Sequence, residues 1–121
     1  MSKYFMSFEE VDELANKVAK KVKGLDLENV YGQPRGGLVP AVMLSHKLGI
    51  PLITDFKEIS SKTLFVDEII DSGKTLIEIE DKLNGAVVVS LTKRYTSKYE
   101  PYYFAKLVED DAWLVFPWEE K

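Results

Sequence analysis

Short apolar segments suited to buried strands alternate with helical segments along most of this chain, and no other feature constrains its fold as strongly. A strand-like segment at 29–32 precedes a helical stretch at 38–48, and another that starts at 64–66 precedes a helical stretch at 75–83. The valine-rich segment 86–91 is the clearest strand signal. Further strands are expected at 51–54 and 102–108. Strands that alternate with helices predict an α/β fold with a mostly parallel, twisted sheet flanked by helices.

A helix is also predicted ahead of the first of these strands, between Ser7 and Lys23. Its apolar residues recur at helical spacing and form one face: Phe8, Val11, Leu14, Ala15, Val18 and Val22. Ser7 and Glu10 match a capping box, and Gly24 follows the last apolar residue as a stop signal. Both ends of this helix are therefore marked in the sequence.

The size and charge of the chain limit what it does. Its 121 residues suit one compact domain, 1–121. The net charge of -4 argues against nucleic-acid binding, because phosphate backbones favour basic surfaces. No cysteine is present, which excludes disulfides and thiolate metal sites. The sequence has neither the apolar core of a signal peptide nor an apolar run long enough to span a membrane, so we expect a cytoplasmic protein without a membrane partner.

Two loops are candidates for ligand binding because of where they fall in this pattern. The segments 33–37 and 68–75 both lie at strand-to-helix junctions. Right-handed crossovers bring such loops to one edge of a parallel sheet, where ligands bind. We therefore expect the two loops to face one pocket.

The second loop combines acids with a phosphate-binding turn. An apolar strand ends in three carboxylates: Asp67, Glu68 and Asp71. Four residues follow where a helix begins, and they can offer N–H groups and hydroxyls to an anion: Ser72, Gly73, Lys74 and Thr75. A sugar phosphate, with hydroxyls at one end and a phosphate at the other, fits both halves. The alternative is a capped helix after an acidic turn.

Two nucleotide-binding motifs were also considered for this loop. A nucleotide P-loop needs a glycine five residues before Gly73, where Glu68 stands instead. The G-x-G-x-x-G pattern of dinucleotide-binding folds is absent as well. Neither motif therefore accounts for the loop.

The first loop and the C-terminal segment offer further ligand-binding groups. Arg35 can make paired hydrogen bonds to a phosphate, and Gly36 and Gly37 allow close approach of the backbone. Lys93 follows the clearest strand, and Trp113 begins an aromatic segment that runs to 118. The alternatives are a surface arginine on a glycine-rich turn, a solvated lysine, and tryptophans used for packing or for an oligomer interface. For Trp118 we favour packing or an oligomer interface.

Three of these segments, in this order, resemble motifs of one enzyme family. The segment 65–75 resembles the motif by which type I phosphoribosyltransferases bind phosphoribosyl pyrophosphate (PRPP). The segment 35–40 resembles the pyrophosphate loop of the xanthine-guanine branch of that family, and 113–119 resembles its base-binding loop. In that branch the peptide before the arginine is often cis, and the sequence leaves open which bond near Arg35 is cis. The resemblance extends from Val30 to Glu119.

The resemblance implies a role for each matching residue. Asp67 and Glu68 would face the ribose hydroxyls and magnesium, while 72–75 would hold the 5-phosphate and 35–37 the pyrophosphate. Asp71 would act at N7 of the purine as general base. The remaining matches concern the base and a second magnesium ion: Lys93 at O6, Trp113 by stacking, Leu114 through its backbone, and Glu119 near the metal.

The function implied is transfer of the phosphoribosyl group of PRPP to guanine, xanthine or hypoxanthine in purine salvage, with Mg²⁺ and as a homodimer or homotetramer. One departure keeps two alternatives open: a transferase for another base, and a PRPP- or nucleotide-binding regulatory module with little turnover. The family has a long flexible loop before the PRPP motif, whereas only 55–62 stands there in this chain. Such a short segment predicts either that a subunit partner helps to cover the site or that closure over the reacting atoms is incomplete.

Overall fold

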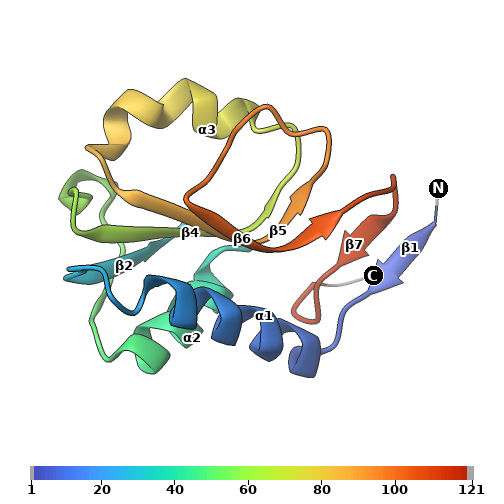
Figure 1. Ribbon diagram of the computed structural model, residues 1–121, viewed down its shortest axis with the longest axis horizontal. Coiled ribbons are helices and arrows are strands. Elements are labelled where there is room, and N and C mark those ends of the chain that lie inside the picture. Colours follow the sequence, from blue (N-terminus) through green and yellow to red (C-terminus); the bar gives the residue numbers. More distant parts are fainter. Residues whose placement is uncertain (1, 120–121) are drawn as a thin grey trace.

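The structure is a computed structural model that describes residues 2–119, and its centre is a parallel sheet. Five strands lie in the order β3-β2-β4-β5-β6 (Figure 1). They are β2 (Asn29–Gly32), β3 (Leu52–Ile53), β4 (Thr63–Ile70), β5 (Val87–Arg94) and β6 (Tyr103–Val108). Every pairing within this sheet is parallel. The α/β fold expected from the alternation of strands and helices is confirmed.

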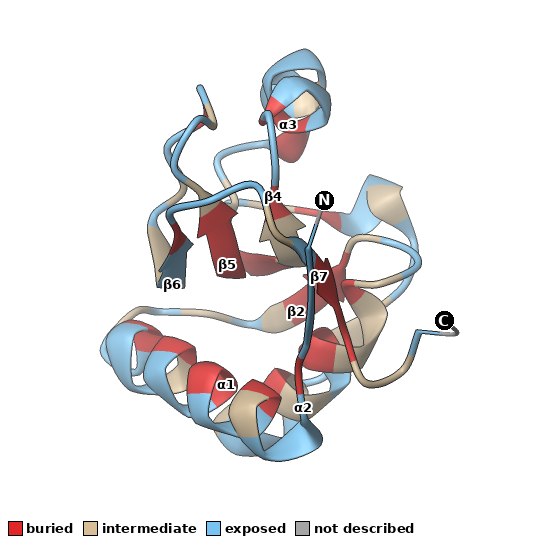
Figure 2. Cartoon of the chain, turned by 90° about the vertical axis from the view of Figure 1, so that its right-hand side faces the viewer, coloured by how far each residue is buried: buried red, intermediate tan, exposed pale blue. Residues whose placement is uncertain are grey.

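Helices cover both faces of the sheet, as Figure 2 shows. The helices α1 (Phe8–Val22) and α2 (Leu38–Leu48) lie on one face, and α3 (Lys74–Ile79) lies on the other. Side chains along β4 alternate between the two cores. Leu64 and Val66 join the core under α1 and α2, whereas Phe65 joins the core under α3. The sheet is therefore buried on both faces at its centre.

The first helix begins and ends close to where its sequence signals predict. Ser7 is the N-cap, and its Oγ accepts a hydrogen bond from the Glu10 N–H at 3.1 Å. In return the Ser7 N–H donates to Glu10 Oε1 at 3.2 Å, which completes the capping box. The buried face comprises Val11, Leu14, Ala15, Val18 and Val22.

The segment around the acids differs from the prediction. We expected the strand to start at 64–66 and to give way to a loop from 68, but β4 continues to Ile70. It does so because β5 pairs with it as far as the register Ile70↔Lys93. Asp67 and Glu68 therefore lie on a strand and not in a loop. The helix expected at 75–83 begins at Lys74 and becomes a 3₁₀ turn from Glu80.

A small second sheet joins distant parts of the chain. The strand β1 (Lys3–Phe5), which was not predicted, pairs in parallel with β7 (Trp113–Val115). The Trp113 N–H donates to the Ser2 carbonyl at 2.9 Å, and Lys3 lies opposite Trp113. This pairing fixes the aromatic segment beside the main sheet. Among the described residues, no helix has both the length and the apolar character needed to cross a membrane.

Candidate functional site

The order of the strands brings the two ligand-binding loops together. From β2 the chain runs through α2 to β3 on one side, whereas β4 pairs with β2 on the other side. The direction of winding thus changes between β2 and β4. Ligands of open α/β sheets bind at the carboxyl ends of strands at such a switch point. The loops that follow β2 and β4 both leave the sheet there.

The loop after β2 lies directly against β4. The Gln33 N–H donates to the Val66 carbonyl at 2.9 Å. A β-carbon on Gly36 would overlap the Glu68 carboxylate, and one on Gly37 would lie 2.6 Å from the Val66 carbonyl oxygen. A side chain at Gly37 would push the loop away from the strand, whereas one at Gly36 would displace the Glu68 carboxylate. The loop also contains the cis bond, which is Pro34–Arg35.

The turn after β4 forms a small cavity of about 170 Å³. Its wall includes the whole predicted phosphate turn: Ser72, Gly73, Lys74 and Thr75. Asp67 and Asp71 line the same cavity, so the structure brings acids and turn together as the sequence predicts. Gly73 has a φ of 84°, a left-handed conformation that favours glycine.

A second loop, 95–102, supports this turn from the side. The Lys98 N–H donates to the Ser72 carbonyl at 3.0 Å. A β-carbon on Gly73 would lie 2.6 Å from Cβ of Tyr99, whose side chain is buried. The conformation of the phosphate turn is therefore set by packing as well as by its own sequence.

A larger cavity of about 750 Å³ lies on the other side of β4. Its wall brings Arg35 together with two carboxylates, those of Glu68 and Glu119. Trp118 also lines it, packed at 5.1 Å between ring centroids on Phe116, as expected of a packing residue. The Phe116 N–H donates to Glu119 Oε1 at 2.8 Å and holds that carboxylate in place.

The two carboxylates and the arginine of this cavity could together bind a metal ion and the polyphosphate that it accompanies. Magnesium is commonly held by one or two carboxylates together with substrate phosphates. Glu68 and Glu119 offer that donor set. Within residues 2–119 no group of three or more acids, histidines or cysteines forms a complete metal site.

A third cavity, of about 80 Å³, shares lining residues with the other two. It shares Asp71 with the phosphate turn and Glu68 with the Arg35 cavity. Trp113, which is 52% exposed, and Leu114 line it, so the structure brings the predicted base-binding loop to Asp71. The three cavities thus share lining residues at the end of β4.

The pKa of the Asp67 carboxyl group is strongly raised. Burial, reinforced by the neighbouring charge of Glu68, raises its pKa to about 9. The carboxyl group is therefore neutral at pH 7 in the ligand-free protein. A neutral carboxyl group can donate a hydrogen bond, for example to a hydroxyl of a ligand.

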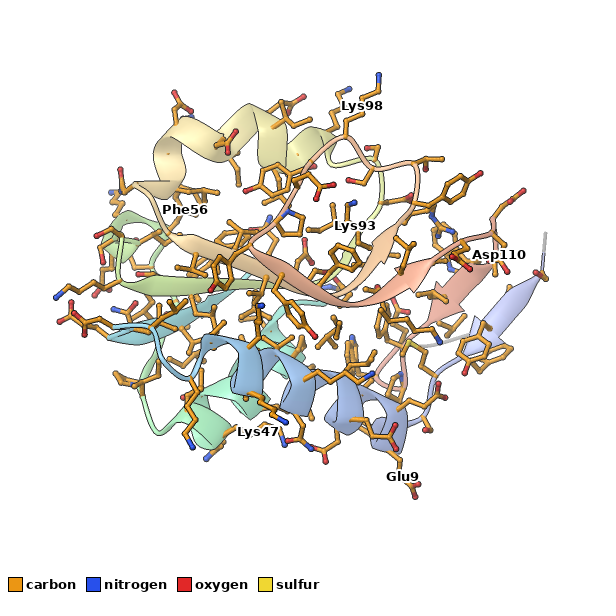
Figure 3. The ribbon with its side chains drawn as sticks, in the orientation of Figure 1. Glu9, Lys47, Phe56, Lys93, Lys98 and Asp110 are labelled. Atoms are coloured by element: carbon orange, nitrogen blue, oxygen red, sulfur yellow. The ribbon has the colours of Figure 1, made fainter. Side chains whose placement is uncertain are left out.

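Lys93 does not lie with the other predicted base-binding residues. Its Nζ donates to Glu100 Oε1 at 2.8 Å and lies 4.9 Å from the centroid of the Phe104 ring. Figure 3 shows Lys93 on the α3 side of the sheet, beneath the loop that carries Lys98, whereas Asp110 lies toward β7. Lys93 is also absent from the wall of the base cavity. Its predicted contact with O6 stays a prediction.

Arg94, the next residue, lines the base cavity instead and was not predicted as a site residue. Its Nε donates to Asp71 Oδ1 at 2.8 Å. The sequence does contain a signal for it. Neighbours on a strand point to opposite faces, so a basic pair at a strand end places one cation on each side of the sheet.

No protein-family model matches the chain, but individual proteins are similar to it. A xanthine-guanine phosphoribosyltransferase of Idiomarina loihiensis is 23% identical over 139 residues, which cover 96% of this chain and 86% of that protein. The enzyme of the same name from Gluconobacter oxydans is 28% identical over 108 residues, or 70% of this chain and 64% of that protein.

A solved structure matches over the full length. The crystal structure of a purine phosphoribosyltransferase from Pyrococcus horikoshii superimposes with a TM-score of 0.83 and 28% sequence identity. The match covers 100% of this chain and 97% of that one, so the two are of nearly equal length.

Proposed function

Because the chain belongs to the type I phosphoribosyltransferase family, we propose that it transfers the phosphoribosyl group of PRPP to a 6-oxopurine base in purine salvage. One observation supports this most strongly: the three adjoining cavities along the end of β4. Their linings suit the three groups that meet at the ribose in the reaction: a monophosphate, a diphosphate and a base.

In this proposal PRPP binds along the end of β4, with its two phosphate groups in different cavities. The turn at 72–75 receives the 5-phosphate, and the hydroxyls of the ribose face Asp67 and Glu68 at the end of β4. The diphosphate extends toward Arg35, whose guanidinium can bind two phosphate oxygens at once. Gly36 and Gly37 add close backbone contacts to the same group.

The reaction breaks the bond from C1′ to the pyrophosphate oxygen and forms a bond from C1′ to a purine nitrogen. Positive charge develops on the ribose ring as the leaving group departs, and Arg35 stabilises the departing anion. Asp71, whose side chain is 59% exposed, accepts the proton that the purine loses. Mg²⁺, held by Glu68 and Glu119, would supply further charge neutralisation on the diphosphate.

The base occupies the third cavity. Trp113 stacks on the purine, and Leu114 offers backbone groups to its pyrimidine edge. A donor at O6 selects an oxo group over the amino group of adenine, since an amino group would leave two donors facing each other. Lys93 supplies that donor only if its ion pair with Glu100 opens.

A regulatory module that binds PRPP without turnover is the second candidate. The short connection before β4 favours it, because a long closing loop is absent from 54–62. The near-equal length of the Pyrococcus horikoshii enzyme favours turnover instead, since a domain of this size then suffices.

Pyrophosphate release, measured with PRPP, Mg²⁺ and a panel of bases, separates these functions. We expect release with guanine, xanthine or hypoxanthine. Release only with a pyrimidine would assign another base, and saturable PRPP binding without release would assign the regulatory module. Arg35→Met should abolish release, whereas Lys47→Met, which removes an ion pair with Asp12 on the helical face, should not.

Assembly and compartment are part of the same proposal. We expect a homodimer or homotetramer in the cytoplasm, because a second subunit would cover the open side of the base cavity beside Trp113. Light scattering coupled to size-exclusion chromatography measures the mass directly. A monomer that turns over at full rate would contradict the assembly.

A further inference from the structure

Arg94 at the end of β5 ties two separate segments of the site together. Its Nε donates to Asp71 Oδ1 at 2.8 Å. Its Nη1 donates to the carbonyl oxygens of Asp110 at 2.8 Å and of Ala112 at 3.1 Å. The Arg94 side chain is 12% exposed, whereas the Asp71 side chain is 59% exposed. Charge-assisted hydrogen bonds of this kind are about twice as strong as neutral ones.

The two segments carry the groups proposed to act on the base. Asp71 follows β4, and Ala112 immediately precedes Trp113. Through residues 2–119, Arg94 makes the only hydrogen bonds that join the turn at 71–75 to the segment 109–113. One guanidinium therefore links the carboxylate to the segment that carries the indole, while Leu114 and Phe116 pack the residues after it into the core under α1 and α2.

The local structure around Trp113 needs such an anchor. The strand β7 has three residues and pairs only with β1, which is equally short. An isolated two-stranded pair is marginally stable by itself. A side chain that fixes the carbonyls at the start of β7 to the main sheet limits the freedom of this pair.

Resting on the proposed function, we infer that Arg94 is a positioning residue for base binding. It holds the Trp113 segment against the Asp71 turn and so shapes the cavity that receives the purine. Because it acts through these two groups, its loss should impair use of the base far more than binding of PRPP.

Two substitutions separate this role from simple stabilisation. Arg94→Met keeps most of the side-chain volume and removes all three hydrogen bonds. Arg94→Lys keeps the charge but cannot bind one carboxylate and two carbonyls in a planar arrangement. The matched control is Lys47→Met, which removes a partly exposed ion pair far from the cavities.

We expect Arg94→Met to raise KM for guanine about tenfold or more, because it breaks a charged hydrogen-bond network. KM for PRPP should change less than about twofold. Arg94→Lys should recover only part of the loss. Trp113→Ala should also raise KM for guanine, and the double variant should be little worse than the poorer single one, since both act through one cavity. Multiplicative effects of the two substitutions, or equal increases in both KM values, would overturn the inference.

A measurement without turnover distinguishes failure of this inference from failure of the proposed function. The chain has two tryptophans, so in a Trp118→Phe variant all tryptophan fluorescence comes from Trp113. In that variant Arg94→Met should lower the fluorescence anisotropy of Trp113, and Lys47→Met should leave it unchanged. Trp118→Phe removes a buried indole N–H that has no partner among the described residues, which favours its tolerance. If the wild type releases no pyrophosphate, the proposed function fails. An unchanged anisotropy overturns the role of Arg94 in either case.

Discussion

Asp67 places an acid with a pKa of about 9 at the floor of the phosphate cavity. The ordinary value for this side chain is 3.8, so between about pH 4 and pH 9 the folded protein binds a proton that the unfolded chain has released. The stability that this protonated group contributes is complete below pH 4 and is lost as the pH rises toward 9. Asp67 thus works against the fold under neutral conditions.

The first prediction follows from this loss of stability as the pH rises. Asp67→Asn keeps the shape of the neutral carboxyl group and removes its titration. We expect the free energy of unfolding, measured by urea denaturation, to fall between pH 5 and pH 8.5 in the wild type and to fall less in the variant. Asp81→Asn, on the exposed 3₁₀ turn, is the control and should follow the wild type. Parallel curves for Asp67→Asn and wild type would show that the carboxyl group titrates normally.

The pair of Lys93 and Glu100 supports a second prediction. The Lys93 ammonium is buried, whereas the Glu100 side chain is 78% exposed, so the pair adds little to stability. If Lys93 binds O6 of the base, the base competes with Glu100 for it. Glu100→Gln should then lower KM for guanine several-fold, and Lys93→Met should raise it. An unchanged KM in both variants would assign Lys93 to packing against Phe104.

Site residues could be predicted from the sequence where they belong to one short, contiguous motif. The turn at 72–75 and Arg35 are found at cavities because a local pattern of glycines and small residues defines them. Arg94 and Glu100 could not be predicted this way. Their contacts join segments up to 23 residues apart, and these depend on strand register and on which face each side chain takes.

Among the structural elements, the turn between β4 and α3 is the most constrained. Gly73 combines a positive φ with close contact to Tyr99. Gly49 has a similar φ of 68° at the end of α2, but a β-carbon there would meet nothing within 4 Å. Substitution of Gly49 therefore tests the energetic cost of the left-handed conformation alone, whereas substitution of Gly73 adds the cost of steric crowding.

A third prediction uses this pair. Gly49→Ala should destabilise the protein by about 1 kcal/mol through its left-handed conformation alone. Gly73→Ala should cost more, because the loop 95–102 must also move, and it alone should weaken PRPP binding by about tenfold or more. Urea denaturation and titration calorimetry with PRPP measure the two effects. Equal losses of stability and unaltered binding would contradict the crowding at Gly73.

The elements themselves followed from sequence to different degrees. The helix α1 was predicted within one residue because its capping box and apolar face are local signals. The length of β4 was underestimated, since the acids at 67 and 68 resemble a strand end although pairing with β5 carries the strand further. The strand β1 is only three residues long, too short for a recognisable sequence pattern, and it forms by pairing with β7.

For the whole molecule, the connection between β3 and β4 decides how the site closes. Phe56 packs edge-on against Tyr31 with ring centroids 5.8 Å apart, and Ile59 is 2% exposed. The Asn84 side chain donates to the Ile59 carbonyl at 2.9 Å. This connection is part of the core on the α3 side and cannot swing over the ligand.

A fourth prediction concerns water. Without a closing loop from this connection, water reaches C1′ of bound PRPP, so we expect slow pyrophosphate release in the absence of any base. Arg35→Met should abolish this reaction, whereas Asp71→Asn should slow transfer to guanine and leave hydrolysis nearly unchanged. High-resolution chromatography of ribose 5-phosphate and nucleotide products distinguishes the two reactions. Complete dependence of release on a base would mean that another element or subunit excludes water.

The pairing of β1 with β7 has a consequence for biosynthesis. These strands hold the third and the 113th residues side by side, so the ribosome must deliver nearly everything between them before they meet. The two phosphate-holding turns are translated much earlier. A chain truncated after residue 105 would keep both phosphate-holding turns and the loop 95–102, but it would lack the Trp113 segment proposed to seat the nucleobase and the Glu119 carboxylate of the Arg35 cavity.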